Sequence, residues 1–164
     1  MTDGTEEIDC IIREASLSDM TAVAQVFRLC RETALPFLPS LHTPEEDLEF
    51  FSNVVFPKNY LFVAIACDTK RICGFIAFSN DFVDHLYVHP ESQGLGLESR
   101  LLNVAKKQSV SLKLWTFQKN LMARKFYSEQ GFIQIEETDG TGNEEKEPDV
   151  LLEWRSNTTT ASFL

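Results

Sequence analysis

The sequence predicts a single domain of the α/β (α+β) class, with a mixed central sheet of about six to seven strands flanked by four helices. Its 164 residues are enough for one domain, and 43% hydrophobic with 24% charged residues is typical of globular proteins. Strand-like and helical patterns follow one another in the order βααβββαβαββ. We expect the domain to span residues 8–155, with loose ends at Met1–Glu7 and Ser156–Leu164.

The N-terminal third predicts one strand and two helices. The strand is Cys10–Glu14, and the first helix starts near Met20, from where apolar residues recur every three or four positions. The second helix opens with a capping box at Thr43–Glu46. We expect it to end before Pro57, because the residue before a proline disfavours the helical conformation.

The middle of the chain changes to strand patterns. Tyr60–Cys67 and Ile72–Ser79 are rich in Phe, Ile and Val and predict an antiparallel hairpin, and Phe82–Val88 predicts a third strand. A helix from about Leu97 separates it from a strand at Ser111–Phe117. This strand, helix, strand order is the crossover that makes neighbouring strands parallel.

The last part of the domain predicts a helix and two strands. Asn120 can cap the helix, which we expect to bury Met122 among other apolar residues, and Gly131 can end it in a left-handed conformation. The strands are Phe132–Glu136 and Asp149–Arg155, joined by a polar loop.

Charge and composition argue against several classes of function. With 25 acidic and 15 basic residues the net charge is −10, which argues against a nucleic-acid partner. No stretch reaches the roughly 18 apolar residues of a membrane span, and the acidic first ten residues do not resemble a targeting peptide. We therefore expect a cytoplasmic protein without a membrane partner. The four cysteines lack metal-ligand spacing, so we expect free thiols and no metal.

A glycine-bearing loop is the most informative segment. It lies between a strand and a helix, where N–H groups converge at the positive end of the helix dipole, an arrangement that binds phosphates. An ordinary turn between a strand and a helix has the same features, so the loop alone leaves both interpretations open. Its residues are Gln93, Gly94, Leu95, Gly96, Leu97, Glu98 and Ser99.

Two motifs occur together in this sequence, Gln93-x-x-Gly96 and Asn120-x-x-Ala123-x-x-Phe126-Tyr127-x-x-x-Gly131-Phe132. The pair resembles the GNAT superfamily of N-acetyltransferases, and the predicted order of strands and helices agrees with that fold. The resemblance covers about Ile11–Arg155 and says little about the substrate.

The resemblance implies transfer of an acetyl group from acetyl-CoA to a primary amine of a small molecule or an exposed peptide, in a ternary complex. It places the pyrophosphate on the N–H groups of residues 93–99. It places the pantetheine arm along a strand that separates from its parallel neighbour and bares backbone groups at Leu86, Tyr87 and Val88. The N–H of Val88 would stabilise the oxyanion, and Asn120 would position the cofactor or serve only as a helix cap.

Tyr127 matches the residue that protonates the departing thiolate in this superfamily, and its other interpretation is a buried aromatic residue. For the general base we choose Asp84, which strand alternation places on the side of Leu86 and Val88, whereas His85 points the other way and is structural. Direct proton transfer from an ammonium to an ordinary aspartate is uphill by about 8 kcal/mol. Asp84 therefore needs a raised pKa, acts through water, or only holds the ammonium.

Glu98 departs from the superfamily pattern, which has a small residue there. Its carboxylate lies in the helix turn that would receive the pyrophosphate, so two anions would compete for one site. Either the side chain points outward, or affinity for the cofactor is weakened. The second case describes the alternative function, a catalytically weak CoA-binding or ligand-sensing module.

The acceptor amine is indicated only by charge. The segment 136–149 holds seven acidic residues and one lysine, so a cationic amine would be attracted to it, although a solvated loop has the same composition. We take His42, Glu144 and Glu145 as candidate substrate-binding residues. Exposed strand edges favour a homodimer. The sequence does not identify the amine, the preferred acyl chain or the oligomeric state.

Overall fold

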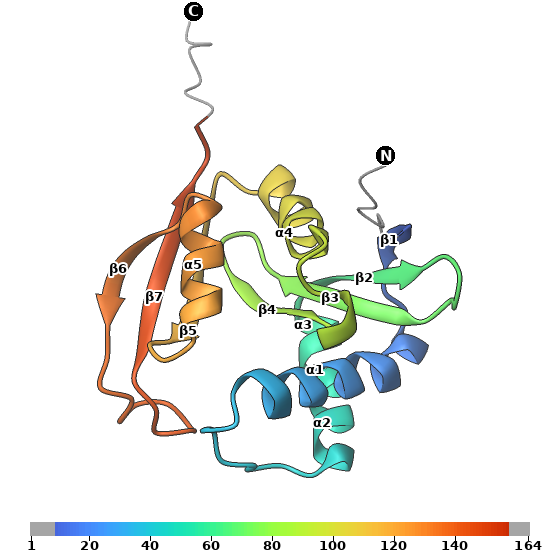
Figure 1. Cartoon of the computed structure of the whole chain (residues 1–164), viewed down its shortest axis with the longest axis horizontal. Helices are drawn as coiled ribbons and strands as arrows, with labels where there is room; N and C mark the ends of the chain where they lie inside the picture. The colour runs from blue at the N-terminus through green and yellow to red at the C-terminus, as the bar shows by residue number, and fades with distance from the viewer. Residues whose placement is uncertain (1–8, 158–164) are drawn as a thin grey trace, which may run out of the picture.

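The central sheet is divided into two antiparallel sheets in the computed structural model, which describes residues 9–157 (Figure 1). The four-stranded sheet has the order β1 (Cys10–Glu14), β2 (Tyr60–Ala66), β3 (Ile72–Phe78), β4 (Val83–Val88). The three-stranded sheet has the order β5 (Ser111–Phe117), β7 (Asp149–Arg155), β6 (Ile133–Glu137).

The two sheets meet at one point. Phe82, just before β4, pairs in parallel with Lys113 of β5, whose N–H donates to Asp81 O at 2.9 Å. No other parallel pairing occurs within residues 9–157. The expected parallel neighbours are therefore present, but they pair at one residue only and then separate.

Helices complete the predicted βααβββαβαββ order, so the α+β fold class is confirmed. They are α1 (Met20–Ala34), α2 (Pro44–Phe50), a π-helical turn (Phe51–Val55), α3 (Phe56–Lys58), α4 (Leu97–Gln108) and α5 (Leu121–Glu129). Short 3₁₀ turns lie at Leu17–Asp19 and Pro90–Ser92.

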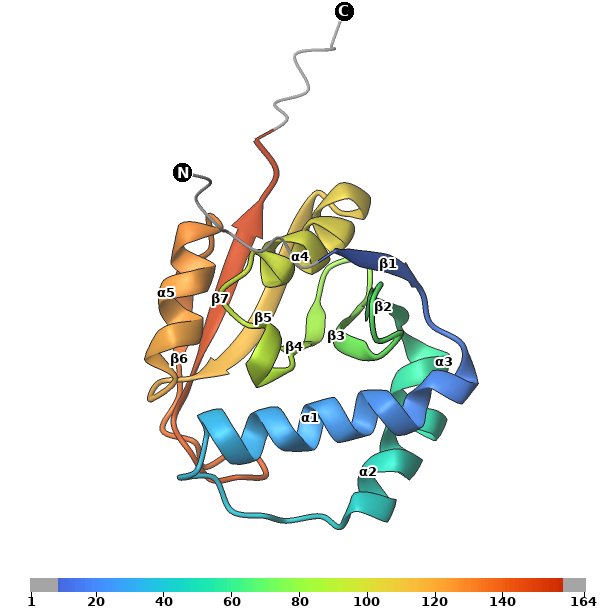
Figure 2. The same ribbon diagram turned by 45° about the vertical axis from the view of Figure 1, so that its right-hand side comes forward.

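Two apolar cores hold these layers together, and Figure 2 shows the helices α1 and α4 on the two sides of the four-stranded sheet. On one face of the four-stranded sheet, α1 and the helical segment around Phe51 pack against Phe75 and Val63. On the other face, α4 packs through Leu101, and this core continues into the second sheet and to Tyr127 of α5. The sheets are thus fixed from both sides, while the gap between β4 and β5 stays free of a covering strand.

The second helical segment is longer than predicted. The expected end before Pro57 is wrong, because the chain continues through a π-helical turn to Lys58. The N–H of Phe56 donates to Phe51 O, five residues earlier, and Pro57 then occupies the first turn of α3, where no N–H is needed. The capping box of Thr43 and Glu46 forms as predicted.

Two smaller expectations are also wrong. Met122 is 78% exposed, because the helical rotation between it and the buried Tyr127 places them on different sides of α5. Ser156 belongs to the fold, since its N–H donates to Val110 O at 2.8 Å. The other residues of the expected loose ends, apart from Asn157, lie in 1–8 and 158–164, outside the described part of the chain.

The core around Phe51 gives a test of stability. Its ring is fully buried and packs edge-on against Phe27 and Phe75, with centroids 5.0 and 5.5 Å away. Phe51→Ala is expected to lower the free energy of unfolding by about 3–5 kcal/mol in urea titrations. Phe50→Ala is the matched control, because Phe50 is 41% exposed and should lose about 1 kcal/mol or less. Equal losses in the two variants would contradict this packing.

Candidate active site

A β-bulge shapes β4 where it leaves β5. Val83 pairs with Phe78 and His85 with Ala77, so Asp84 is an extra residue without a partner on β3. Asp84 and His85 consequently both line the cavities at this end of the strand. Strand alternation breaks at the bulge, so it does not place Asp84 and His85 on opposite sides, but the His85 ring packs against Phe27, Phe50 and Phe51, in the structural role expected of it.

Beyond the bulge, β4 turns free backbone groups toward the gap. The N–H of His89 donates to Cys73 O at 2.8 Å, and the register continues through Val88 opposite Gly74 and Tyr87 opposite Phe75. In an antiparallel ladder the bonded pairs alternate, so Tyr87 bonds β3 whereas the N–H groups of Leu86 and Val88 point away from it. These are the backbone groups that the sequence singled out.

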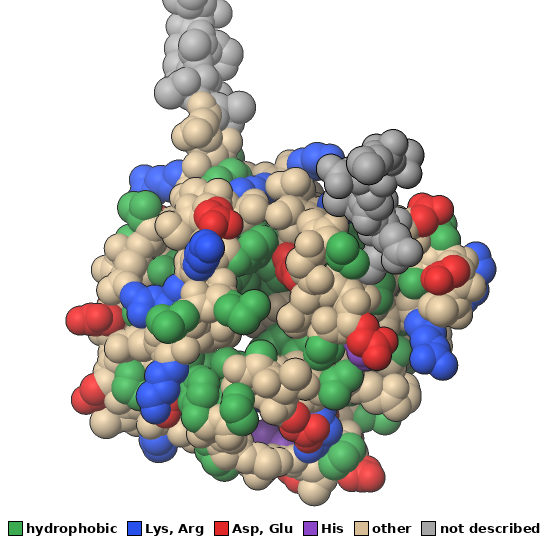
Figure 3. Space-filling view, in the orientation of Figure 1, with side chains coloured by type: hydrophobic (Ala, Val, Ile, Leu, Met, Phe, Trp, Pro, Cys, Tyr) green, Lys and Arg blue, Asp and Glu red, His purple; other side chains and the backbone are tan. Residues whose placement is uncertain are grey.

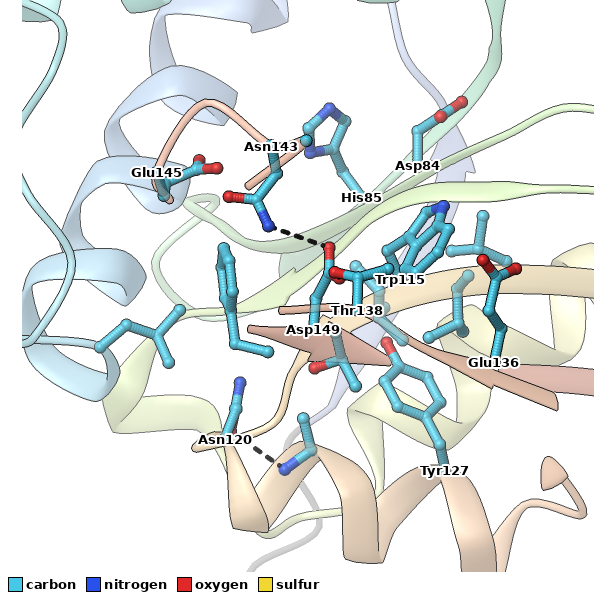
Figure 4. A pocket seen from close by; sticks show the side chains of 18 of the residues that line it. Asp84, His85, Trp115, Asn120, Tyr127, Glu136, Thr138, Asn143, Glu145 and Asp149 are labelled. Carbon is cyan, nitrogen blue, oxygen red and sulfur yellow. Dashed lines mark hydrogen bonds between the residues drawn. The ribbon is translucent and has the colours of Figure 1, made fainter. Parts of the chain in front are cut away.

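The first cavity has a volume of about 780 Å³ and fills the space between the separated strands (Figure 4). Leu86 and Tyr87 of β4 form one wall, and Trp115 of β5 forms another. Tyr127 and Asn120 enter from α5 and its N-terminus. The structure therefore brings Leu86 and Tyr87 to one cavity with Asn120 and Tyr127, whereas Val88 is buried at the end of β4 and does not line it.

Tyr127 points its hydroxyl group into this cavity (Figure 4). Its side chain is buried, and the rings of Phe126 and Phe132 pack at an angle on it, with centroids 5.1 and 5.4 Å away. Burial, with a smaller contribution from Tyr87, raises its pKa well above that of an ordinary tyrosine. The phenol is thus protonated at neutral pH, and its hydroxyl makes no hydrogen bond to a group in residues 9–157.

Asn120 combines its two predicted roles. Its Oδ1 accepts a hydrogen bond from the N–H of Ala123 at 3.2 Å, which caps α5, and the side chain also lines the first cavity. In Figure 4 the side-chain nitrogen points toward the cavity, where it is free to donate.

The loop at residues 93–99 presents open backbone amides. Gly94 and Gly96 have φ angles of +78° and +81°, in the left-handed region, and nothing lies within 4 Å of where a side chain would start. None of the N–H groups of 93–99 donates to an acceptor in the described part of the chain. The Gln93 side chain donates to Val88 O at 2.9 Å, so the loop is fastened to the end of β4.

Glu98 lies in the first turn of α4, on the side that faces α1. Burial raises the pKa of the Cys30 thiol of α1 to about 12, and the nearby charge of Glu98 adds to this increase. Gln130 of the α5 C-cap meets the same turn, where its Nε2 donates to Ser99 Oγ at 3.0 Å. The predicted phosphate loop is therefore bounded by α1 on one side and α5 on the other.

A second cavity of about 950 Å³ adjoins the first. It lies between α1, the connection from α1 to α2, and α2. Figure 3 shows the molecular surface hollowed between α5 and α1, where the first cavity lies, with hydrophobic side chains around the hollow. Both cavities are lined by Leu35, Asp84, His85, Tyr87 and Glu145. The bulge on β4 thus stands at the junction of the two cavities.

The comparisons with known proteins agree with this architecture. The family model described as Acetyltransferase (GNAT) family matches residues 26–132. The chain belongs to the GNAT acetyltransferase family. A comparison with curated proteins gave no match.

Solved structures of GNAT acetyltransferases share the fold. Apo YjaB from Escherichia coli has a TM-score of 0.72 at 20% identity, over 88% of this chain and 97% of that one. PaiA N-acetyltransferase from Thermoplasma acidophilum, in complex with coenzyme A, has a TM-score of 0.70 at 21% identity, over 90% of this chain and 99% of that one. YncA from Salmonella typhimurium, solved with acetyl-CoA, has a TM-score of 0.68 at 16% identity, over 90% of this chain and 94% of that one. In this GNAT protein, no helix within residues 9–157 is long and apolar enough to cross a membrane.

Two ion pairs link the loop 138–148 of this GNAT protein to its helical half, and we call them the clasp. His42 Nε2 lies 2.6 Å from Glu144 Oε1, and Arg31 Nη2 lies 3.0 Å from Glu145 Oε1. The three candidate substrate-binding residues are therefore brought together at the rim of the second cavity. Their charges, however, are paired within the protein.

Burial sets the charge states at the junction. The pKa of His85 is lowered to about 4, mainly by burial and further by Arg31, so its imidazole is neutral at pH 7. Partial desolvation raises the pKa of Asp84, although the residue is exposed at the cavity wall. A carboxyl group with a raised pKa and a neutral imidazole therefore both line the two cavities.

The clasp predicts a pH dependence. Hydrogen bonding to Glu144 is the main cause that raises the pKa of His42 above 6.5, and Glu46 adds to it. Because the folded state has the higher pKa, the stabilisation is complete below about pH 6.5 and is lost as the pH rises through the folded value. In NMR titrations, Glu144→Gln is expected to move the pKa of His42 back toward 6.5.

Glu129→Gln is the control for this titration, because it removes one exposed carboxylate at the end of α5 and should leave the pKa of His42 unchanged. Identical titration of His42 in wild type and Glu144→Gln would show that the clasp does not form in solution.

Proposed function

We propose that this GNAT protein transfers an acetyl group from acetyl-CoA to a primary amine of a small molecule or exposed peptide, by direct attack in a ternary complex. The observation that carries the proposal is the gap between β4 and β5. A loop with open amides lies beside it, a protonated tyrosine points into it, and the second cavity adjoins it.

The loop 93–99 holds the pyrophosphate of acetyl-CoA in this proposal. Its open N–H groups lie at the N-terminus of α4, where the helix dipole favours anions. The pantetheine arm then enters the gap and pairs with the backbone groups that β4 turns away from β3. The complexes of PaiA with coenzyme A and of YncA with acetyl-CoA, which share this fold, support the assignment.

The N–H of Val88 polarises the thioester carbonyl. It points away from β3 toward the gap, so it can donate to the oxygen on which negative charge develops as the amine attacks. The C–S bond then breaks, and the electron pair leaves with the sulfur of coenzyme A.

Tyr127 donates the proton that the departing thiolate needs. Its raised pKa keeps the phenol protonated until the thiolate leaves, and burial in the same cavity also raises the proton affinity of the thiolate, which favours the transfer. The proton that the attacking nitrogen loses restores the phenol, directly or through water.

Asp84 holds the acceptor amine at the junction. Desolvation raises the pKa of Asp84, which reduces the difference between its pKa and that of an ammonium group. The carboxylate has no ion-pair partner in residues 9–157. Asp84 therefore attracts the ammonium and, through water, accepts its proton.

A second function is favoured by one observation. Glu98 places a carboxylate in the first turn of α4, where it competes with the pyrophosphate for the helix dipole. A protein weakened in this way would be a CoA-binding or ligand-sensing module without turnover.

Release of thiol from acetyl-CoA over a panel of amines tests the function. Tyr127→Phe is expected to lower kcat about 100-fold with the KM for acetyl-CoA within about twofold, because the lost proton acts only as the thiolate leaves. Tyr60→Phe is the control, since Tyr60 is half exposed at the start of β2 and outside both cavities.

Two results would contradict the proposed transfer. Binding of acetyl-CoA in calorimetry without thiol release from any amine would favour the sensing module. Wild-type turnover in Tyr127→Phe would remove the tyrosine from the mechanism.

A further inference from the structure

Arginine pairs with three of the seven carboxylates that line the second cavity. Arg28 lies 2.9 Å from Asp47 and 3.4 Å from Glu32, and Arg31 lies 3.0 Å from Glu145. All five side chains line the cavity. These carboxylates are therefore already paired and offer little to a further cation.

His42 engages two more acids, Glu144 at 2.6 Å and Glu46 at 3.6 Å. Of the carboxylates on the cavity wall, Asp84 and Glu49 remain without an ion pair in residues 9–157. Of these two unpaired carboxylates, only Asp84 also lines the first cavity. The arrangement thus leaves one unpaired carboxylate where the two cavities join.

His85 adds a neutral hydrogen-bond acceptor beside Asp84. Its ring is held among aromatic side chains, with centroids 5.2 Å from Phe51, 5.8 Å from Phe27 and 6.0 Å from Phe50. Neither ring nitrogen has a hydrogen-bond partner in the described part of the chain. Because the imidazole is neutral at pH 7, it does not repel an ammonium and can accept a hydrogen bond from it.

Apolar side chains form the rest of the wall. Leu41, Phe50 and Val54 are 44%, 41% and 38% exposed and line this cavity, together with Phe27 and Leu38. Such side chains gain from contact with an apolar group that removes them from water. These side chains offer no partner to the second and third ammonium groups of a polyamine, for which Glu49 is the one other carboxylate on this wall without an ion pair in residues 9–157.

We infer that the second cavity binds a primary monoamine that carries an aromatic or branched apolar group. The ammonium lies at Asp84 and His85, and the apolar group packs against Phe50 and Val54. This inference rests on the proposed acetyl transfer and narrows its acceptor, which the overall acidity of the chain would have suggested to be a polycation.

Calorimetry on the full chain saturated with coenzyme A tests binding without turnover. 2-Phenylethylamine is expected to bind at least tenfold more tightly than ethylamine, which has the ammonium alone, and than spermidine, which has three amines. Asp84→Asn is expected to weaken 2-phenylethylamine and ethylamine alike, because both depend on the carboxylate.

Phe50→Ser is expected to weaken 2-phenylethylamine at least fivefold and to leave ethylamine unchanged. Leu17→Ser is the matched control, because Leu17 is 56% exposed and lies outside both cavities. Val54→Ser replaces Phe50→Ser if thermal denaturation shows that the latter is unfolded.

Three results would overturn the inference: spermidine or ethylamine binding as tightly as 2-phenylethylamine, binding of none of the three amines, or unchanged binding of 2-phenylethylamine in a folded Phe50 or Val54 variant. The proposed function fails separately. If 2-phenylethylamine binds as expected but no amine releases thiol from acetyl-CoA, the cavity assignment stands and the acetyl transfer does not.

Discussion

The parting of β4 from β5 is the constraint on which the rest of the structure depends. The strands pair at Phe82 and Lys113 and nowhere else in residues 9–157. Backbone N–H groups that have lost a neighbouring strand need another partner, and those of Leu86 and Val88 face the gap. Helices pack on both sheets, and one apolar core runs from the four-stranded sheet into the three-stranded one, so packing holds the two sheets in this separated arrangement.

Most of the fold could be predicted because its signals are local. The bounds of β5 and β7 coincide with the predicted Ser111–Phe117 and Asp149–Arg155, and the Thr43 capping box is present. The predicted helix end before Pro57 was wrong because a π-helical turn precedes this proline. That turn includes Phe51, which packs into the core, so it reflects tertiary packing and not a local signal. The division into two sheets is likewise a tertiary property that no single segment encodes.

The candidate site divides in the same way. Tyr127 and Asn120 could be found because a short motif places both at one helix, and both line the same cavity. The bulge at Asp84 could not be predicted, because it arises from pairing with β3. It also shifts the strand alternation from which the direction of His85 was predicted. The contact of His42 with Glu144 joins residues 102 positions apart, and it turns two predicted ligand-binding residues into partners of each other.

The central claim is that the open amides of residues 93–99 receive the pyrophosphate of coenzyme A at the mouth of the gap. Titration of ¹⁵N-labelled protein with coenzyme A, followed by amide NMR, tests it most directly. The amide resonances of Gly94, Gly96 and Leu97 are expected to move downfield and to saturate together with that of Val88. Saturable binding of coenzyme A that leaves these four resonances in place would contradict the account.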